Sequence, residues 1–133
     1  MKIIMLKGPC CSHKTTTINL VYYQLLRHKA KIVEKRIDYE GSHDFSAVLS
    51  YAGKKVAIDS AGDEAFRLKK DVLQKYADCD FLIMANRNFV TVTKEVYRLD
   101  AAPLIIEKTV PRGADVVVSE DLEDMKAIVA YIS

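Results

Sequence analysis

The chain has 133 residues, of which 50% are hydrophobic and 29% are charged, and its formal net charge is +2. This length favours one hydrophobic core over two, so we expect residues 1–133 to form a single domain. The charge is nearly balanced and lacks the long basic block typical of proteins that bind duplexes through phosphates. Composition therefore does not support a nucleic-acid partner.

The cysteines and the apolar runs limit the compartment that we expect for this protein. Cys10, Cys11 and Cys79 follow no zinc or disulfide spacing and favour reduced thiols. The first apolar run is too short for a secretory signal, and no run approaches the roughly 18 apolar residues of a membrane span. We therefore expect a cytoplasmic protein without a membrane partner.

Short runs rich in β-branched residues alternate with segments of helical periodicity along the chain, an order typical of parallel β/α units. The expected strands are Lys2 to Leu6, Lys31 to Ile37, Lys55 to Asp59, Phe81 to Ala85 and Leu104 to Glu107, with a less regular sixth at Val116 to Val118. The expected helices are Thr15 to His28, Asp63 to Tyr76 and Asp121 to Ile132, with less regular ones at Phe45 to Tyr51 and Thr93 to Leu99. This order predicts an α/β fold, a three-layer sandwich with a mostly parallel five-stranded sheet.

The segment from Gly8 to Thr15 joins the first expected strand to the first expected helix. A phosphate-binding loop in this setting needs a Gly, four residues, a second Gly, then Lys and Ser or Thr, because its N–H groups must point at phosphate oxygens. This chain has every part except the second Gly, which is His13. The helix N-terminus adds N–H donors that favour an anion.

The segment resembles the Walker A motif Gly-Pro-Pro-Gly-Ser-Gly-Lys-Thr of P-loop NTPases, a superfamily that includes ATPases and nucleotide kinases. The resemblance implies a P-loop NTPase-like fold, with ATP and Mg²⁺ as cofactors and Lys14 as a catalytic contact to the phosphates. Thr15 would bind Mg²⁺. The nucleotide-binding residues that it implies are Gly8, Pro9, Cys10, Cys11, Ser12, His13, Lys14, Thr15 and Thr16, together with Arg112 after the fifth strand.

His13 leaves more than one interpretation open. The position favours a positive φ, which costs a residue other than Gly on the order of 1–2 kcal/mol. Alternatively, the imidazole lies over the phosphates and makes their affinity pH-sensitive. A third interpretation is a turn that only connects a strand to a helix and binds nothing.

Three further residues are candidates for the chemistry of the site. Asp59 ends an apolar strand and is followed by Ser-Ala-Gly, so it resembles the Walker B acid that the strand beside the first one delivers to Mg²⁺. Asp38 ends the second strand, where kinases of this fold place an acid that accepts a proton from the attacking hydroxyl. Arg87 follows the fourth strand and is a candidate for stabilising phosphoryl charge. Each also has a plain structural interpretation, as a helix cap or a solvated surface charge.

Three functions remain open from the sequence. The first is binding of Mg-ATP with NTP hydrolysis or phosphoryl transfer to an unknown small-molecule acceptor, as in an ATPase or a small-molecule kinase. The second is a nucleotide-responsive module that acts on a protein partner or a second copy of the chain without turnover. The third is an inactive scaffold. Base preference and acceptor are not encoded in any motif that we find.

Overall fold

The computed structural model describes residues 1–9, 12–61, 75–109 and 114–133, with the side chains of 114–118 outside that description. In chain order its elements are β1 (Lys2–Lys7), α1 (Lys14–Arg27), β2 (Lys31–Asp38), β3 (Phe45–Tyr51), β4 (Lys54–Asp59), β5 (Phe81–Asn86), α4 (Val90–Leu99), β6 (Leu104–Glu107) and α5 (Ala114–Ile132). The fold is α/β.

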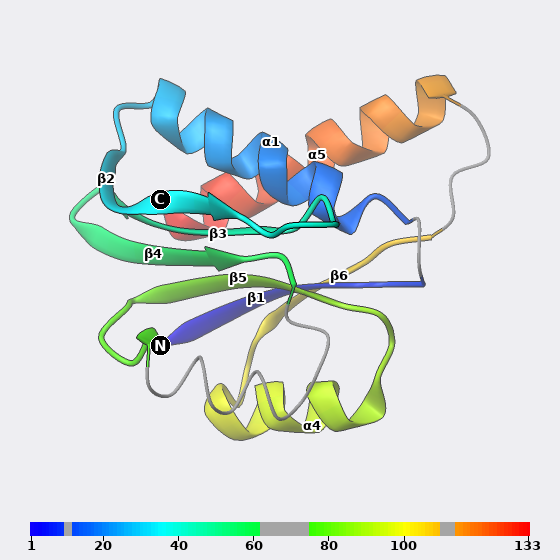
Figure 1. Ribbon diagram of the computed structural model, residues 1–133. Coiled ribbons are helices and arrows are strands. Elements are labelled where there is room, and N and C mark those ends of the chain that lie inside the picture. Colours follow the sequence, from blue (N-terminus) through cyan, green and yellow to red (C-terminus); the bar gives the residue numbers. More distant parts are fainter. Residues whose placement is uncertain (10–11, 62–74, 110–113) are drawn as a thin grey trace.

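The six strands form one mixed sheet in the order β2-β3-β4-β5-β1-β6. The pairs β4 with β5, β5 with β1 and β1 with β6 are parallel, whereas β3 is antiparallel to both β2 and β4. Helices α1 and α5 lie on one face of the sheet and α4 lies on the other (Figure 1). The strand β1 therefore lies inside the sheet, and the turn after it opens at the carboxyl edge, where open α/β sheets bind ligands.

The alternation of side chains along β1 builds a core on each face of the sheet. Ile4 and Leu6 join the cluster that packs against α1 and α5. Ile3 and Met5 join the cluster that contains Val92 and Val96 of α4. Because both faces of β1 are covered, its central residues are apolar without interruption, as is typical of buried parallel strands.

Two of the expected elements are wrong, and the sheet has one strand more than expected. Residues 45–51 are strand β3 and not a helix. Residues 116–118 continue helix α5 and form no strand. The two-residue turn Ala52 and Gly53, with φ of 52° and 76°, closes β3 and β4 into a hairpin, because both residues adopt the positive φ that such turns require.

The other expected elements agree with the structure within about two residues at most ends, as is usual for element boundaries. Two helices are exceptions. Helix α5 begins seven residues before the expected start at Asp121, and α4 begins three residues before the expected start at Thr93. The expected helix from Asp63 to Tyr76 falls mostly outside the described residues.

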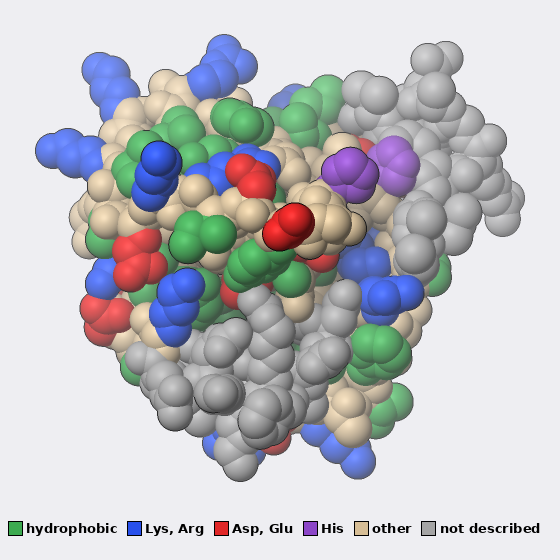
Figure 2. Space-filling model, in the orientation of Figure 1, with side chains coloured by type: hydrophobic (Ala, Val, Ile, Leu, Met, Phe, Trp, Pro, Cys, Tyr) green, Lys and Arg blue, Asp and Glu red, His purple; other side chains and the backbone are tan. Residues whose placement is uncertain are grey.

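The surface gives two findings that bear on partners. Among the described residues on the face drawn in Figure 2, Lys and Arg side chains are interspersed with Asp and Glu. Within the described ranges, no helix is long and apolar enough to cross a membrane.

Candidate functional site

The turn between β1 and α1 begins at Gly8, whose backbone is tightly enclosed. A Cβ at this position would come within 2.4 Å of the carbonyl oxygen of Lys108 and within 2.8 Å of Ser12 Oγ. The Gly8 N–H donates to the carbonyl of Asn86 at 3.0 Å. Glycine is therefore required here by the close approach of the segment after β6.

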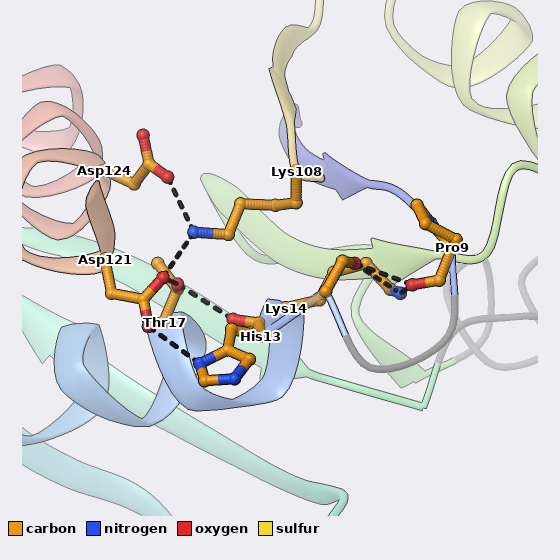
Figure 3. Close-up of polar contacts among 8 residues, drawn as sticks. Pro9, His13, Lys14, Thr17, Lys108, Asp121 and Asp124 are labelled. Atoms are coloured by element: carbon orange, nitrogen blue, oxygen red, sulfur yellow. Dashed lines mark hydrogen bonds and ion pairs between the residues drawn. The ribbon is translucent and has the colours of Figure 1, made fainter. Parts of the chain in front are cut away.

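Lys14 begins α1 and turns its side chain back into the turn (Figure 3). Its ammonium donates to the carbonyls of Gly8 at 2.9 Å and Pro9 at 2.7 Å and lies 3.3 Å from Ser12 Oγ. The residue is only 7% exposed. A buried cation is costly unless hydrogen bonds or negative charge compensate it, and these contacts with the turn compensate the Lys14 ammonium while they keep its positive charge at the start of α1.

His13 precedes the helix with φ 62° and ψ 29°, the left-handed conformation that we expected at this position. Its carbonyl accepts from the N–H of Thr17 at 3.0 Å and from the Thr17 hydroxyl at 2.9 Å. Its imidazole Nδ1 lies 3.2 Å from Asp121 Oδ2 of α5. This contact holds the imidazole ring beside α5.

His13 belongs to a cluster that we call the α1–α5 cluster, made of His13, Thr17, Lys108, Asp121 and Asp124. Lys108 Nζ donates to Asp121 Oδ1 at 2.6 Å and to Asp124 Oδ2 at 2.8 Å (Figure 3). Burial alone would lower the pKa of Lys108, but its hydrogen bonds to the two aspartates outweigh burial and raise this pKa above its ordinary value. The cluster therefore fixes α5 beside the start of α1.

A cavity of about 610 Å³ lies at the start of α1. The described residues that line it are Ser12, His13, Lys14, Thr15, Thr16, Asn19, His43 and Asp44. Five of these were expected from the sequence as nucleotide-binding residues. Cys10, Cys11 and Arg112, which were expected with them, lie outside the described residues.

Thr15 and Asp44 meet at the edge of this cavity. The Thr15 hydroxyl donates to Asp44 Oδ1 at 2.9 Å, and the Ser60 hydroxyl donates to the same oxygen at 3.0 Å. The sequence predicted Thr15 as a metal ligand. It placed Asp44 only in a polar connection with Glu40, Ser42 and His43 where a substrate or partner surface could lie, because the contact with Thr15 depends on the tertiary fold.

Asp59 ends β4, as expected, but β4 does not lie beside β1, because β5 pairs with both. The expected placement of residues 55–59 next to the first strand is therefore wrong. The Asp59 carboxylate is 4% exposed and accepts from the hydroxyls of Tyr39 at 3.3 Å and Tyr76 at 3.4 Å, and from the Ala61 N–H at 3.2 Å. Burial, and secondarily the nearby Asp59 charge, raise the pKa of Tyr76, so this tyrosine stays a hydrogen-bond donor.

The two remaining catalytic candidates are not among the described residues that line the cavity. Asp38 pairs with Arg36 at 2.8 Å on the edge strand β2, and its side chain is 68% exposed. Arg87 is exposed after β5. The neighbouring Asn86 is fully buried and bonds the start of α4, accepting from the Phe89 N–H at 3.0 Å.

Comparison of this chain with protein-family models, curated proteins and solved structures gave no match. Over the part of the chain that the structure describes, no group of three or more His, Cys, Asp or Glu side chains is placed so that it could hold a metal ion. The interpretation of the site therefore rests on its own geometry.

Replacing His13 by Gly is expected to raise the free energy of unfolding by about 0.5–1 kcal/mol. Gly adopts φ near 62° without the steric cost that a Cβ imposes, although it gains entropy in the unfolded chain. Urea denaturation, monitored by circular dichroism, measures the change in the free energy of unfolding. Lys29→Gly is the matched control, because Lys29 is an exposed residue with φ 69° at the other end of α1. If the free energy of unfolding rises in Lys29→Gly but falls in His13→Gly, the contact of His13 with Asp121 stabilises the fold by more than the backbone strain destabilises it.

Proposed function

We propose that the turn between β1 and α1 binds the phosphate groups of a nucleotide, with ATP and Mg²⁺ as the expected ligand pair. The observation that carries the proposal is the buried Lys14 ammonium, enclosed by the turn at the N-terminus of a helix and beside a cavity of about 610 Å³. Helix N–H donors and a lysine together form the usual electrostatic environment for phosphate.

The residues that are present fit this pair of ligands. Gly8 admits the close approach of the Lys108 carbonyl, which fixes the start of the turn. Lys14 supplies a positive charge, and the Thr15 hydroxyl supplies an oxygen of the kind that Mg²⁺ prefers. When bound, Mg²⁺ would neutralise phosphate charge and favour transfer or hydrolysis of the terminal phosphoryl group.

A second function, nucleotide-dependent binding of a protein partner without turnover, is favoured by a separate observation. Neither Asp38 nor Arg87 lines the cavity, and Asp38 is paired with Arg36 at the sheet edge. The site thus has groups that hold a polyphosphate, whereas the acid and the cation expected to act on it lie elsewhere.

A calorimetric titration with ATP, GTP, CTP, UTP and inorganic triphosphate, each with and without Mg²⁺, tests the proposal. We expect saturable binding of at least one nucleotide that strengthens with Mg²⁺. A parallel assay for released phosphate separates the two functions, because the binding module predicts affinity without turnover. Absence of binding by every ligand would contradict both and favour the inactive scaffold.

A further inference from the structure

Asp44 is the only carboxylate among the described residues that line the cavity. It precedes β3 and is held by its neighbours: its carbonyl accepts from the Tyr39 N–H at 2.9 Å, and its N–H donates to Ser42 Oγ at 3.2 Å. The hairpin of β3 and β4 places Ser60 beside it, because the Phe45 N–H donates to Ser60 Oγ at 2.9 Å. Backbone contacts therefore fix the position of this carboxylate.

The two oxygens of Asp44 have different surroundings. Oδ1 accepts from the hydroxyls of Thr15 and Ser60, whereas Oδ2 accepts no hydrogen bond from any described residue. Asp59 differs, because three donors already surround its buried carboxylate. A carboxylate that lines a cavity and has one oxygen without a hydrogen-bond donor among the described residues is better suited to bind a cation than a carboxylate that is buried among donors.

We propose that Asp44, and not Asp59, is the carboxylate that binds a divalent cation together with Thr15. The inference rests on the proposed function, since nucleotide phosphates would complete the oxygen ligands of the cation. Ser60 acts as a positioning residue, because its hydroxyl donates to the same oxygen, Oδ1 of Asp44, as the Thr15 hydroxyl. The proposed cation site therefore lies between the start of helix α1 and the segment before β3.

Asp44→Asn is the most direct test, because Asn keeps the shape and an oxygen for both hydroxyls and removes the charge. Isothermal titration with ATP, in Mg²⁺ and in EDTA, gives the gain in affinity that Mg²⁺ supplies. We expect Asp44→Asn to bind ATP in EDTA at least as well as the parent chain, because a negative charge has been removed. The gain from Mg²⁺ should fall about 10- to 100-fold, as for the loss of an interaction between charged groups.

Glu40→Gln is the matched control, because it removes one negative charge from the same connection at an exposed residue outside the cavity lining. It should retain the full gain from Mg²⁺. A melting curve without nucleotide checks that each variant is folded. The gain in ATP affinity from Mg²⁺ is also measured for Asp59→Asn, because Asp59 is the other candidate for the carboxylate that binds the cation.

The outcomes separate this inference from the proposed function. If the parent chain binds ATP and Asp44→Asn keeps its gain from Mg²⁺, the inference is wrong and the proposed function stands. If only Asp59→Asn loses the gain in ATP affinity from Mg²⁺, Asp59 is the Mg²⁺ ligand, as the sequence predicted, and the inference is wrong. If the parent chain binds no ATP, the proposed function fails and the inference fails with it.

Discussion

Replacing Lys14 by Met is expected to weaken nucleotide binding about 100-fold or more. The ammonium is 7% exposed and lies against the turn, so its loss removes a charge that is only weakly screened by solvent. Interactions with a charged group contribute about 1.5–3 kcal/mol each, and a phosphate chain engages this group more than once. Titration calorimetry with Mg-ATP measures the loss directly.

The same substitution also removes the bonds from Lys14 to the carbonyls of Gly8 and Pro9, so folding must be measured separately. Thermal melting with and without ligand does this, because a ligand at 100 times its Kd stabilises the folded state by about 2.7 kcal/mol. We expect this shift in the parent chain and about 0.4 kcal/mol or less in Lys14→Met at the same ligand concentration. Lys126→Met, at an exposed lysine of α5, is the control and should keep the shift. An unchanged shift in Lys14→Met would contradict the proposed site.

Replacing Lys108 by Met is expected to lower the free energy of unfolding by about 3–5 kcal/mol. The substitution leaves the carboxylates of Asp121 and Asp124 without the cation to which both are bonded, and Asp121 is 5% exposed. Removal of one partner from a buried ion pair destabilises by about this amount. Urea denaturation at neutral pH measures the loss.

The pH dependence gives a second readout for Lys108. Its pKa in the folded chain lies above the ordinary value of 10.5. The stabilisation is therefore fully present below pH 10.5 and is lost as pH rises through the folded pKa. Lys108→Met should abolish this part of the alkaline loss of stability.

Two comparisons make the Lys108 prediction specific. Lys55→Met is the control, because its ion pair with Asp78 is largely exposed and should matter much less. The double variant with Asp121→Asn should recover part of the loss, since it also removes the buried charge. Equal stability of Lys108→Met and the parent chain would mean that the α1–α5 cluster does not stabilise the fold.

Local patterns were sufficient for the strands on the parallel side of the sheet and for the turn. Strands β1, β4, β5 and β6 are short apolar runs bounded by polar residues, and α1 follows a motif with fixed spacing. The left-handed conformation of His13 could also be predicted locally, because the motif requires at this position a positive φ, which Gly adopts more readily than other residues.

The errors arose where tertiary context overrides local preference. Phe45 to Tyr51 contains Ser, Ala and Leu, and the signal for a strand was the following Ala52-Gly53 turn. The three valines at 116–118 favour a strand locally, yet they lie inside a 19-residue helix whose later turns pack against α1. Neither outcome can be read from a short window.

The parts of the site that the sequence did not provide come from distant pairings. Asp44 meets Thr15 across 29 positions, and Asp121 meets His13 across 108 positions. No periodicity or motif reports such contacts, because they depend on the strand order and on the position of α5. A polar connection at residues 40–44 was visible in the sequence, but which of its side chains faces the turn was not.

The contact of Gly8 with Lys108 has a consequence for the order of folding during synthesis on the ribosome. The turn after β1 is synthesised before β6, yet its backbone is enclosed by a carbonyl about a hundred positions later in the chain. A nascent chain that has not yet emerged beyond β6 lacks this enclosure, and one that has not emerged beyond Asp121 also lacks the partner of His13. The turn after β1 therefore acquires its final surroundings only after β6 and the start of the α5 contacts have been synthesised.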